Sequence, residues 1–164
     1  MKQIALDIGL ASSPSFSNFF AGPNDVALKH LELWFGQEDY GCSSTVKSLA
    51  AILSGKGLPA LERLGLMNSE WEAELINAIA ASKLLPQLKV LDLSMGVLFT
   101  EGAAALINHK AKFAHLKKLI LDDNYLEEQS DALKKALPMV EMGTQREPDG
   151  EDDDEFARYV SVGE

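Results

Sequence analysis

The chain has 164 residues, 46% of them hydrophobic, and a formal net charge of −10, which fits one folded domain or a short repeat array. Residues 141–164 hold nine acidic residues and two arginines, a net of −7, and nothing resembles the basic stripe of a nucleic-acid-binding protein. The sequence has no apolar run long enough for a membrane span and no secretory pattern at its start. Cys42 is the single cysteine, which rules out an internal disulfide framework. Together these features predict a cytoplasmic protein.

One six-residue pattern, L-x-x-L-x-L, recurs along the chain. Strict copies begin at Leu28, Leu61, Leu88 and Leu116, so successive starts are 33, 27 and 28 residues apart. A softer copy occupies residues 1–6. Alternating apolar positions are typical of a short strand with one buried face. Because four strict copies at nearly constant spacing seldom arise by accident, the pattern predicts a repeat protein.

Apolar residues at helical spacing fill the stretches between these strands. Ser69 and Glu72 have the spacing of a capping box and are expected to open one helix, while Gly55 is placed to end another. Trp71 takes a core position by its place in the repeat. The other predicted helices span residues 43–53, 101–109 and 127–137, with a weak candidate at 12–24.

Together these strands and helices resemble the ribonuclease-inhibitor-like class of leucine-rich repeats. The resemblance implies an α/β solenoid of about five repeats of ~28 residues, with a curved parallel sheet on the concave side and helices on the convex side. That domain would cover residues 1–142. The family places Asn or Cys three residues after the last Leu of each copy, and Asn124 alone fits. The other copies carry Gly9, Gly36, Ser69 and Gly96, which points to a divergent, bacterial member.

The two ends of the chain depart from the repeat. Because no polar cap precedes the first strand, we expect a fragment of a longer protein. Residues 137–142 can form a terminal strand, although a Leu-Pro pair leaves its register ambiguous. Residues 143–164 are expected to form an acidic tail that contains the charged block 151–155. The apolar end at 156–162 suits a short added strand or a docked peptide.

The binding surface is expected on the concave sheet, where the third, fifth and seventh positions of each copy point outward. Trp and Arg are enriched at interface hot spots, and Met is frequent in adaptable contacts. Gly65 would leave a hollow between larger neighbours. Trp34 adjoins Phe35, and one of the two must point inward, so a buried Trp34 stays an alternative. The candidate partner-binding residues are His30, Glu32, Trp34, Arg63, Met67, Asp92 and Lys118.

These observations predict a non-catalytic scaffold that binds a protein or peptide partner, with no cofactor and no metal. One alternative is a structural or targeting segment of a larger protein whose active part lies elsewhere. A more remote alternative is a cysteine-dependent enzyme, with Cys42 as nucleophile and His30 as its base. The sequence contains no metal-binding or phosphate-binding motif that would favour an enzyme.

Overall fold

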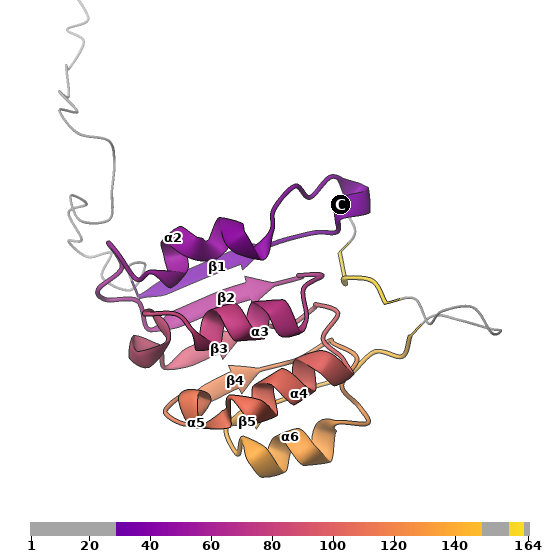
Figure 1. Cartoon of the computed structure of the whole chain (residues 1–164). Helices are drawn as coiled ribbons and strands as arrows, with labels where there is room; N and C mark the ends of the chain where they lie inside the picture. Colours follow the sequence, from indigo (N-terminus) through magenta and orange to yellow (C-terminus); the bar gives the residue numbers. More distant parts are fainter. Residues whose placement is uncertain (1–28, 149–157, 163–164) are drawn as a thin grey trace, which may run out of the picture.

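The computed structural model describes residues 29–148 and 158–162. It is an α/β fold in which five parallel strands lie in the order of the sequence (Figure 1). The soft motif copy at residues 1–6, the weak helix at 12–24, Gly9 and the charged block at 151–155 lie outside the described residues. Among the described helices none has the length and apolar character needed to cross a membrane.

Each strict motif copy supplies one strand, which begins at the third position of the motif. The register sets equivalent positions side by side, so that His30 lies opposite Arg63, Arg63 opposite Val90, and Val90 opposite Lys118. The spacing of the leucines therefore determines which side chains become neighbours across the sheet. The strands are β1 His30–Trp34, β2 Arg63–Met67, β3 Val90–Asp92, β4 Lys118–Ile120 and β5 Val140–Glu141.

The structure resolves the register of the last strand. Val140 pairs with Leu119 and Glu141 with Ile120, so Val140 takes the fourth position of the motif. Leu137 is therefore the first position and Met142 the sixth, and both side chains are buried. The Leu-Pro pair at this point begins the motif, whereas the earlier Leu-Pro pairs precede it.

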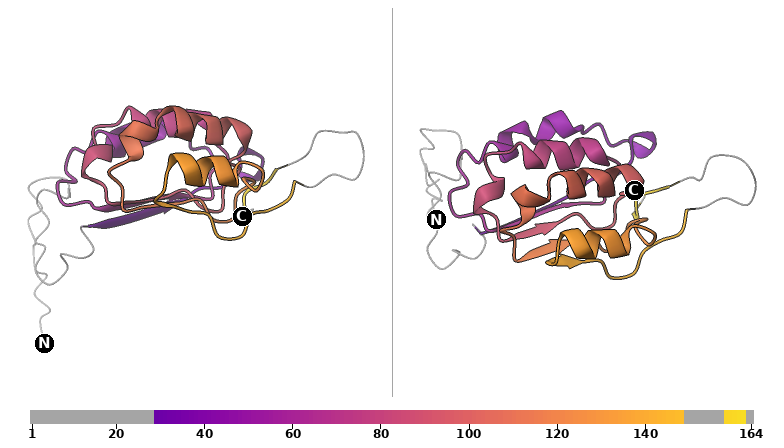
Figure 2. Two further views of the ribbon diagram at one scale, coloured as in Figure 1. Left: turned by 90° about the horizontal axis from the view of Figure 1, so that it is seen from below. Right: turned by 60° about the horizontal axis from the view of Figure 1, so that its bottom comes forward.

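The helices lie on one face of the sheet, as the left view of Figure 2 shows. The helix predicted at residues 43–53 begins later, as a 3-10 turn followed by one turn of α-helix. The helix predicted at 101–109 is confirmed within one residue at each end. The helical elements are η3 Glu38–Tyr40, η4 Val46–Leu49, α2 Ala50–Leu53, α3 Ala73–Ala80, η5 Leu85–Gln87, α4 Thr100–Asn108, α5 Lys110–Phe113 and α6 Ser130–Ala136.

The core forms between the sheet and the helices. Leucines at the first, fourth and sixth positions are buried in the motif copies that supply β2, β3 and β4, and the apolar faces of the helices cover them. In β1, by contrast, Leu31 and Leu33 are only partly buried and pack against this core. Trp71 packs against the core as predicted, with its ring centroid 4.9 Å from that of Phe35.

The predicted capping box at Ser69 and Glu72 is wrong. Glu72 immediately precedes α3, but neither side chain caps that helix. The Glu72 carboxylate instead accepts hydrogen bonds from the backbone N–H groups of Phe99 and Gly102, at 3.0 and 3.3 Å. These groups stand at the start of α4, where free N–H donors need partners. Glu72 thus caps the neighbouring helix and ties the two strand–helix units together.

Candidate functional site

The sheet face opposite the helices carries the third, fifth and seventh positions of the motif. Among the described residues no helix or strand covers it, and we call it the open face. Its side chains are mostly exposed or partly exposed, in contrast with the buried leucines that alternate with them. All seven residues predicted to bind a partner belong to this face.

Trp34 is the most exposed large apolar side chain on the open face, at 53% exposed. It pairs in register with Met67 on β2. Phe35, the next residue, packs inward against the core and contacts Trp71. The structure therefore decides between the two sequence alternatives, because Phe35 occupies the inward position and leaves Trp34 in solvent beside a flexible thioether.

Arg63 lies between two carboxylates on neighbouring strands. Its guanidinium is 2.8 Å from Asp92 on β3 and 3.3 Å from Glu32 on β1. Asp92 also accepts hydrogen bonds from the backbone and hydroxyl of Ser94. Since both carboxylates bind it, the long Arg63 side chain is held in one orientation across the sheet.

Gly65 does not leave the open hollow that the sequence suggests. A Cβ atom added at Gly65 would lie 2.8 Å from Cγ of Glu32. The stem of Glu32 therefore lies over the glycine, which lets its carboxylate reach Arg63. The lack of a side chain at Gly65 makes room for the ion pair and creates no pocket.

The ionisation of Glu32 reflects its two partners. A hydrogen bond of 2.8 Å with the His30 ring lowers the pKa of the Glu32 carboxyl below its ordinary value of 4.5, and Arg63 lowers it further. Opposite charges and hydrogen bonds to a carboxylate favour its ionised form. Glu32 is therefore a stable negative centre on the open face.

Two predicted residues differ from the others in what they offer a partner. Asp92 is only 4% exposed and its carboxylate faces Arg63 and Ser94, so it holds Arg63 in position and presents little surface itself. Lys118 is exposed and forms a 2.7 Å ion pair with Glu141. It lies three strands from His30, at ~4.8 Å per strand, and so belongs to a separate part of the face.

A second polar region lies where the strands end. We call the turns that follow β2 to β5 the turn edge. Asn124 is fully buried there: its side chain accepts from the Leu98 backbone N–H at 3.0 Å and donates to the carbonyls of Leu93 and Leu121 at 2.9 and 3.2 Å. This one amide therefore satisfies backbone groups of two neighbouring units.

Gln145 does the same in the following turn, and the sequence reasoning missed it. It accepts from the Leu126 N–H at 3.1 Å and donates to the carbonyls of Leu121, at 3.0 Å, and Met142. Gln145 stands three residues after Met142, just as Asn124 stands three after Leu121. The ambiguous register of the terminal strand concealed this equivalence.

Gly96 stands at the same position of the third strict copy, where a side chain would not fit. A Cβ at Gly96 would lie 2.8 Å from the carbonyl oxygen of Ser69 and 3.1 Å from the side-chain oxygen of Asn124. Ser69, its counterpart in the second copy, is buried, and its carbonyl accepts from Val97. At Gly96, close backbone packing therefore takes the place that an asparagine side chain would fill.

The pairing of Cys42 with His30 that the enzyme hypothesis requires is not what the structure shows. His30 begins β1, whereas Cys42 lies in the loop beyond the other end of that strand. Each histidine is hydrogen-bonded to a group other than the thiol: His30 to Glu32, His109 to Asn77 and His115 to the Leu85 carbonyl. Within residues 29–148 and 158–162 no three His, Cys, Asp or Glu side chains gather to hold a metal ion.

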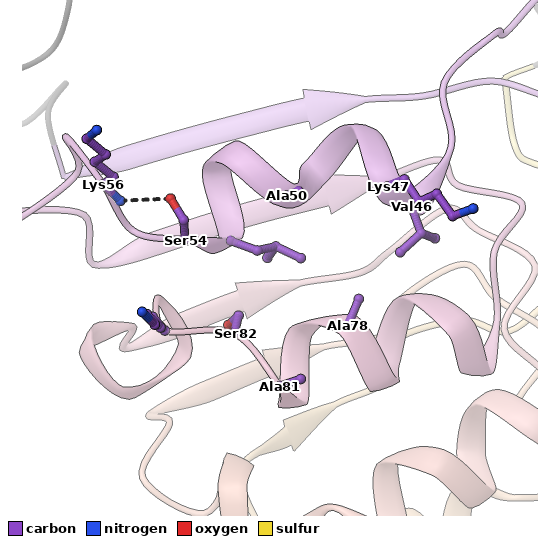
Figure 3. Close-up of a pocket in the computed structure, with 10 residues that line it drawn as sticks. Val46, Lys47, Ala50, Ser54, Lys56, Ala78, Ala81 and Ser82 are labelled. Carbon is purple, nitrogen blue, oxygen red and sulfur yellow. Dashed lines mark hydrogen bonds between the residues drawn. The ribbon is translucent and has the colours of Figure 1, made fainter.

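The helical side has a shallow groove of about 580 Å³ between the η4–α2 segment and α3 (Figure 3). Small side chains from both segments, including Ala50, Ala78 and Ala81, line it, and lysines lie toward its ends. The groove arises because α2 has only one turn and the facing residues are alanines. It contains no cluster of groups suited to catalysis.

Comparisons with known proteins add one similarity. No family model matches the chain, and no curated protein matches it. A crystal structure of a protein from Bacteroides fragilis, a structural genomics target, is 33% identical with a TM-score of 0.62, over 71% of this chain and 35% of that one. The chain thus spans about a third of that protein's length. Its description names no activity or partner, so the similarity bears on the fold.

Proposed function

We propose that this chain is a leucine-rich-repeat scaffold of the ribonuclease-inhibitor-like class, which binds a protein or peptide partner on its open face and catalyses no reaction. The repeat assignment is supported by the correspondence of motif and structure. Every strict copy supplies one parallel strand, and helices follow on one side only. The buried amides of Asn124 and Gln145, which bridge successive units, are a further regularity of a stacked repeat.

The binding assignment is carried by Trp34. This large aromatic side chain is 53% exposed on the sheet, next to Met67. Its removal from water by a partner would favour binding, because burial of apolar surface lowers the free energy. The ion-paired Arg63 lies on the same face, with its fork already oriented, at the other end of the paired strands, where it faces His30. Trp and Arg are both enriched at interface hot spots, and a preorganised Arg has little side-chain entropy left to lose on binding.

The chemistry of the face defines the partner. An apolar side chain of the partner would cover Trp34 and Met67, while polar groups would meet His30, Glu32 and Arg63. Extended peptides and protein loops can supply both across two strands, a width of ~5 Å. The cluster on β1 and β2 is therefore the centre of the proposed interface, and Lys118 lies at its periphery.

Affinity capture from lysate with quantitative mass spectrometry tests this proposal. The unmodified chain is compared with Trp34→Ala/Arg63→Ala and with the control Lys110→Ala/Lys134→Ala, whose sites lie on helices of the other side. A partner of the open face is retained by the control and reduced at least about tenfold by the double variant. Calorimetry with the purified partner then gives the affinities directly. If every captured protein is retained equally by the two variants, the open face is not the binding surface.

A further inference from the structure

The five described residues Arg158–Val162 lie against the turn edge of β2, β3 and β4. We call them the docked segment. At each of these turns one residue adopts the left-handed backbone conformation: Asn68 at φ 56°, Met95 at φ 67° and Asp123 at φ 54°. Each stands two residues after the last leucine of its motif copy. The repeat thus places three equivalent turns in a row, and the docked segment contacts all three.

The backbone of the docked segment is held by polar groups of these turns. The Asn68 side chain donates to the Val162 carbonyl at 2.8 Å and accepts from its N–H at 2.9 Å. The Met95 carbonyl accepts from the Ser161 N–H at 3.0 Å. The Tyr125 hydroxyl contacts both backbone polar groups of Tyr159 at 3.0 Å. Main-chain recognition of this kind suits any extended peptide.

Three side chains of the docked segment are also recognised. Arg158 forms a 3.0 Å ion pair with Glu72, and its guanidinium stacks 4.6 Å above the Phe99 ring. Val160 is 5% exposed, and the Ser161 hydroxyl donates to the Asp123 carboxylate. In contrast, Tyr159 and Val162 are 45% and 44% exposed. The contacts therefore recognise the side chains of the pattern Arg-x-Val-Ser. They do not select the side chains at positions 159 and 162.

The turn edge contains a buried polar side chain whose hydrogen bonds depend on the docked segment. Asn68 is only 1% exposed, yet two of its three side-chain hydrogen bonds go to Val162 and the third goes to the Phe35 carbonyl. If the segment left, this buried amide would lose most of its partners, and buried polar groups are rarely left unsatisfied. Residues that lie far from 158–162 in the sequence thus depend on them.

We propose that the turn edge is a binding site for extended peptides with the pattern Arg-x-Val-Ser, and that residues 158–162 occupy it as a tethered ligand which a free peptide can replace. A segment tethered to its own site acts at an effective concentration in the millimolar range. The site is therefore filled in the isolated chain, and an external peptide binds it only when the tethered segment is weakened or outcompeted. This site is separate from the open face and does not depend on its role.

The first experiment weakens the tethered ligand in the full chain. Val160→Asp introduces a charge at a buried contact, and circular dichroism verifies that the variant is folded. A fluorescent peptide of residues 156–164 is titrated, with anisotropy as the readout. It should bind the variant at least about tenfold more tightly than the unmodified chain, because the competing segment has been removed. The same peptide carrying Val160→Asp is the control and should not bind. A folded variant that does not bind the peptide at about 1 mM overturns the proposal.

A double-mutant cycle locates the peptide. In the Val160→Asp chain, the further change Glu72→Gln should weaken the peptide about tenfold, while leaving unchanged the affinity of a peptide with Arg158→Ala. Equal losses for both peptides would mean that Glu72 and the peptide arginine do not interact, and would overturn the assigned pose.

Hydrogen exchange of the unmodified chain decides the matter even if the Val160→Asp chain does not fold. The amides of Ser161 and Val162 should exchange at least about 100-fold faster than the amide of Leu93, which bonds to Ile120 in the sheet, because a separable ligand opens locally. Exchange of all three at one rate would show that the docked segment is an integral part of the fold, and would overturn the proposal.

Discussion

The open face and the turn edge use the same polar residue types for different purposes. On the open face, Glu32 and Arg63 are partly exposed and bind each other. At the turn edge, Asn68 and Asn124 are buried and bind backbone groups. Exposure leaves the first set available to a partner, whereas each buried group of the second set needs a hydrogen-bond partner at all times, since an unpaired buried polar group is costly.

Glu72 shows how the two kinds of role can meet in one residue. Its carboxylate caps α4 through Phe99 and Gly102, and also binds Arg158 of the docked segment. Burial of a polar group therefore does not exclude recognition, provided that the ligand supplies the missing hydrogen-bond partner. The comparison predicts large stability effects at the turn edge and small ones on the open face.

The largest effect is expected at Asn124. Asn124→Ala removes an amide that satisfies buried backbone groups of Leu93, Leu98 and Leu121, and should lower the free energy of unfolding by roughly 3 kcal/mol. Urea denaturation measures the change by linear extrapolation. Gln145→Ala is the matched comparison and should cost less, because Gln145 is partly exposed. Equal, small losses at both positions would contradict the structural role given to burial at the turn edge.

The next effect concerns Gly96, which stands where the proposed leucine-rich-repeat class carries Asn or Cys. Restoring the expected residue with Gly96→Asn should destabilise the protein by about 2 kcal/mol, because the new Cβ meets the Ser69 carbonyl and the Asn124 side chain. Thermal and urea unfolding would measure the loss. Gly41→Asn is a control, since nothing lies within 4 Å of a Cβ there, although its φ of 93° adds some strain. A gain in stability at position 96 would show that the consensus amide fits after all.

Much of the fold could be predicted from the leucine spacing, because each leucine decides both a buried position and a register. The same spacing placed His30, Arg63 and Trp34 on one face. The sequence could not show which groups are the hydrogen-bond partners of the polar side chains. Glu72 has the local spacing of a capping box, yet its partners lie 27 and 30 residues away. The sequence allowed a short added strand or a docked peptide at 156–162, and the described residues 158–162 form no strand and dock on the turn edge. The groups that hold this segment lie in distant parts of the chain, so no local pattern encodes them.

On the open face, acidification should produce a smaller effect. Hydrogen bonding to His30 and then to Arg63 depresses the pKa of Glu32 in the folded chain, so its contribution to stability is full above its ordinary value of 4.5 and is lost as the pH falls through the lower folded value. The difference in unfolding free energy between the unmodified chain and Glu32→Gln should therefore shrink from about pH 6 to about pH 3. High salt should reduce it further. A difference that does not vary with pH would mean that Glu32 is not held by these partners.

The smallest stability effect is expected at the residue most important for the proposed function. Trp34→Ala should change the free energy of unfolding by less than about 0.5 kcal/mol, because the side chain is 53% exposed and lies on the surface of the sheet. The adjacent change Phe35→Ala should cost about 3 kcal/mol, since that ring packs against Trp71 and the core. Urea denaturation of both variants separates the two neighbours. A large loss at Trp34 would assign this side chain to the fold, and would remove the observation on which binding at the open face rests.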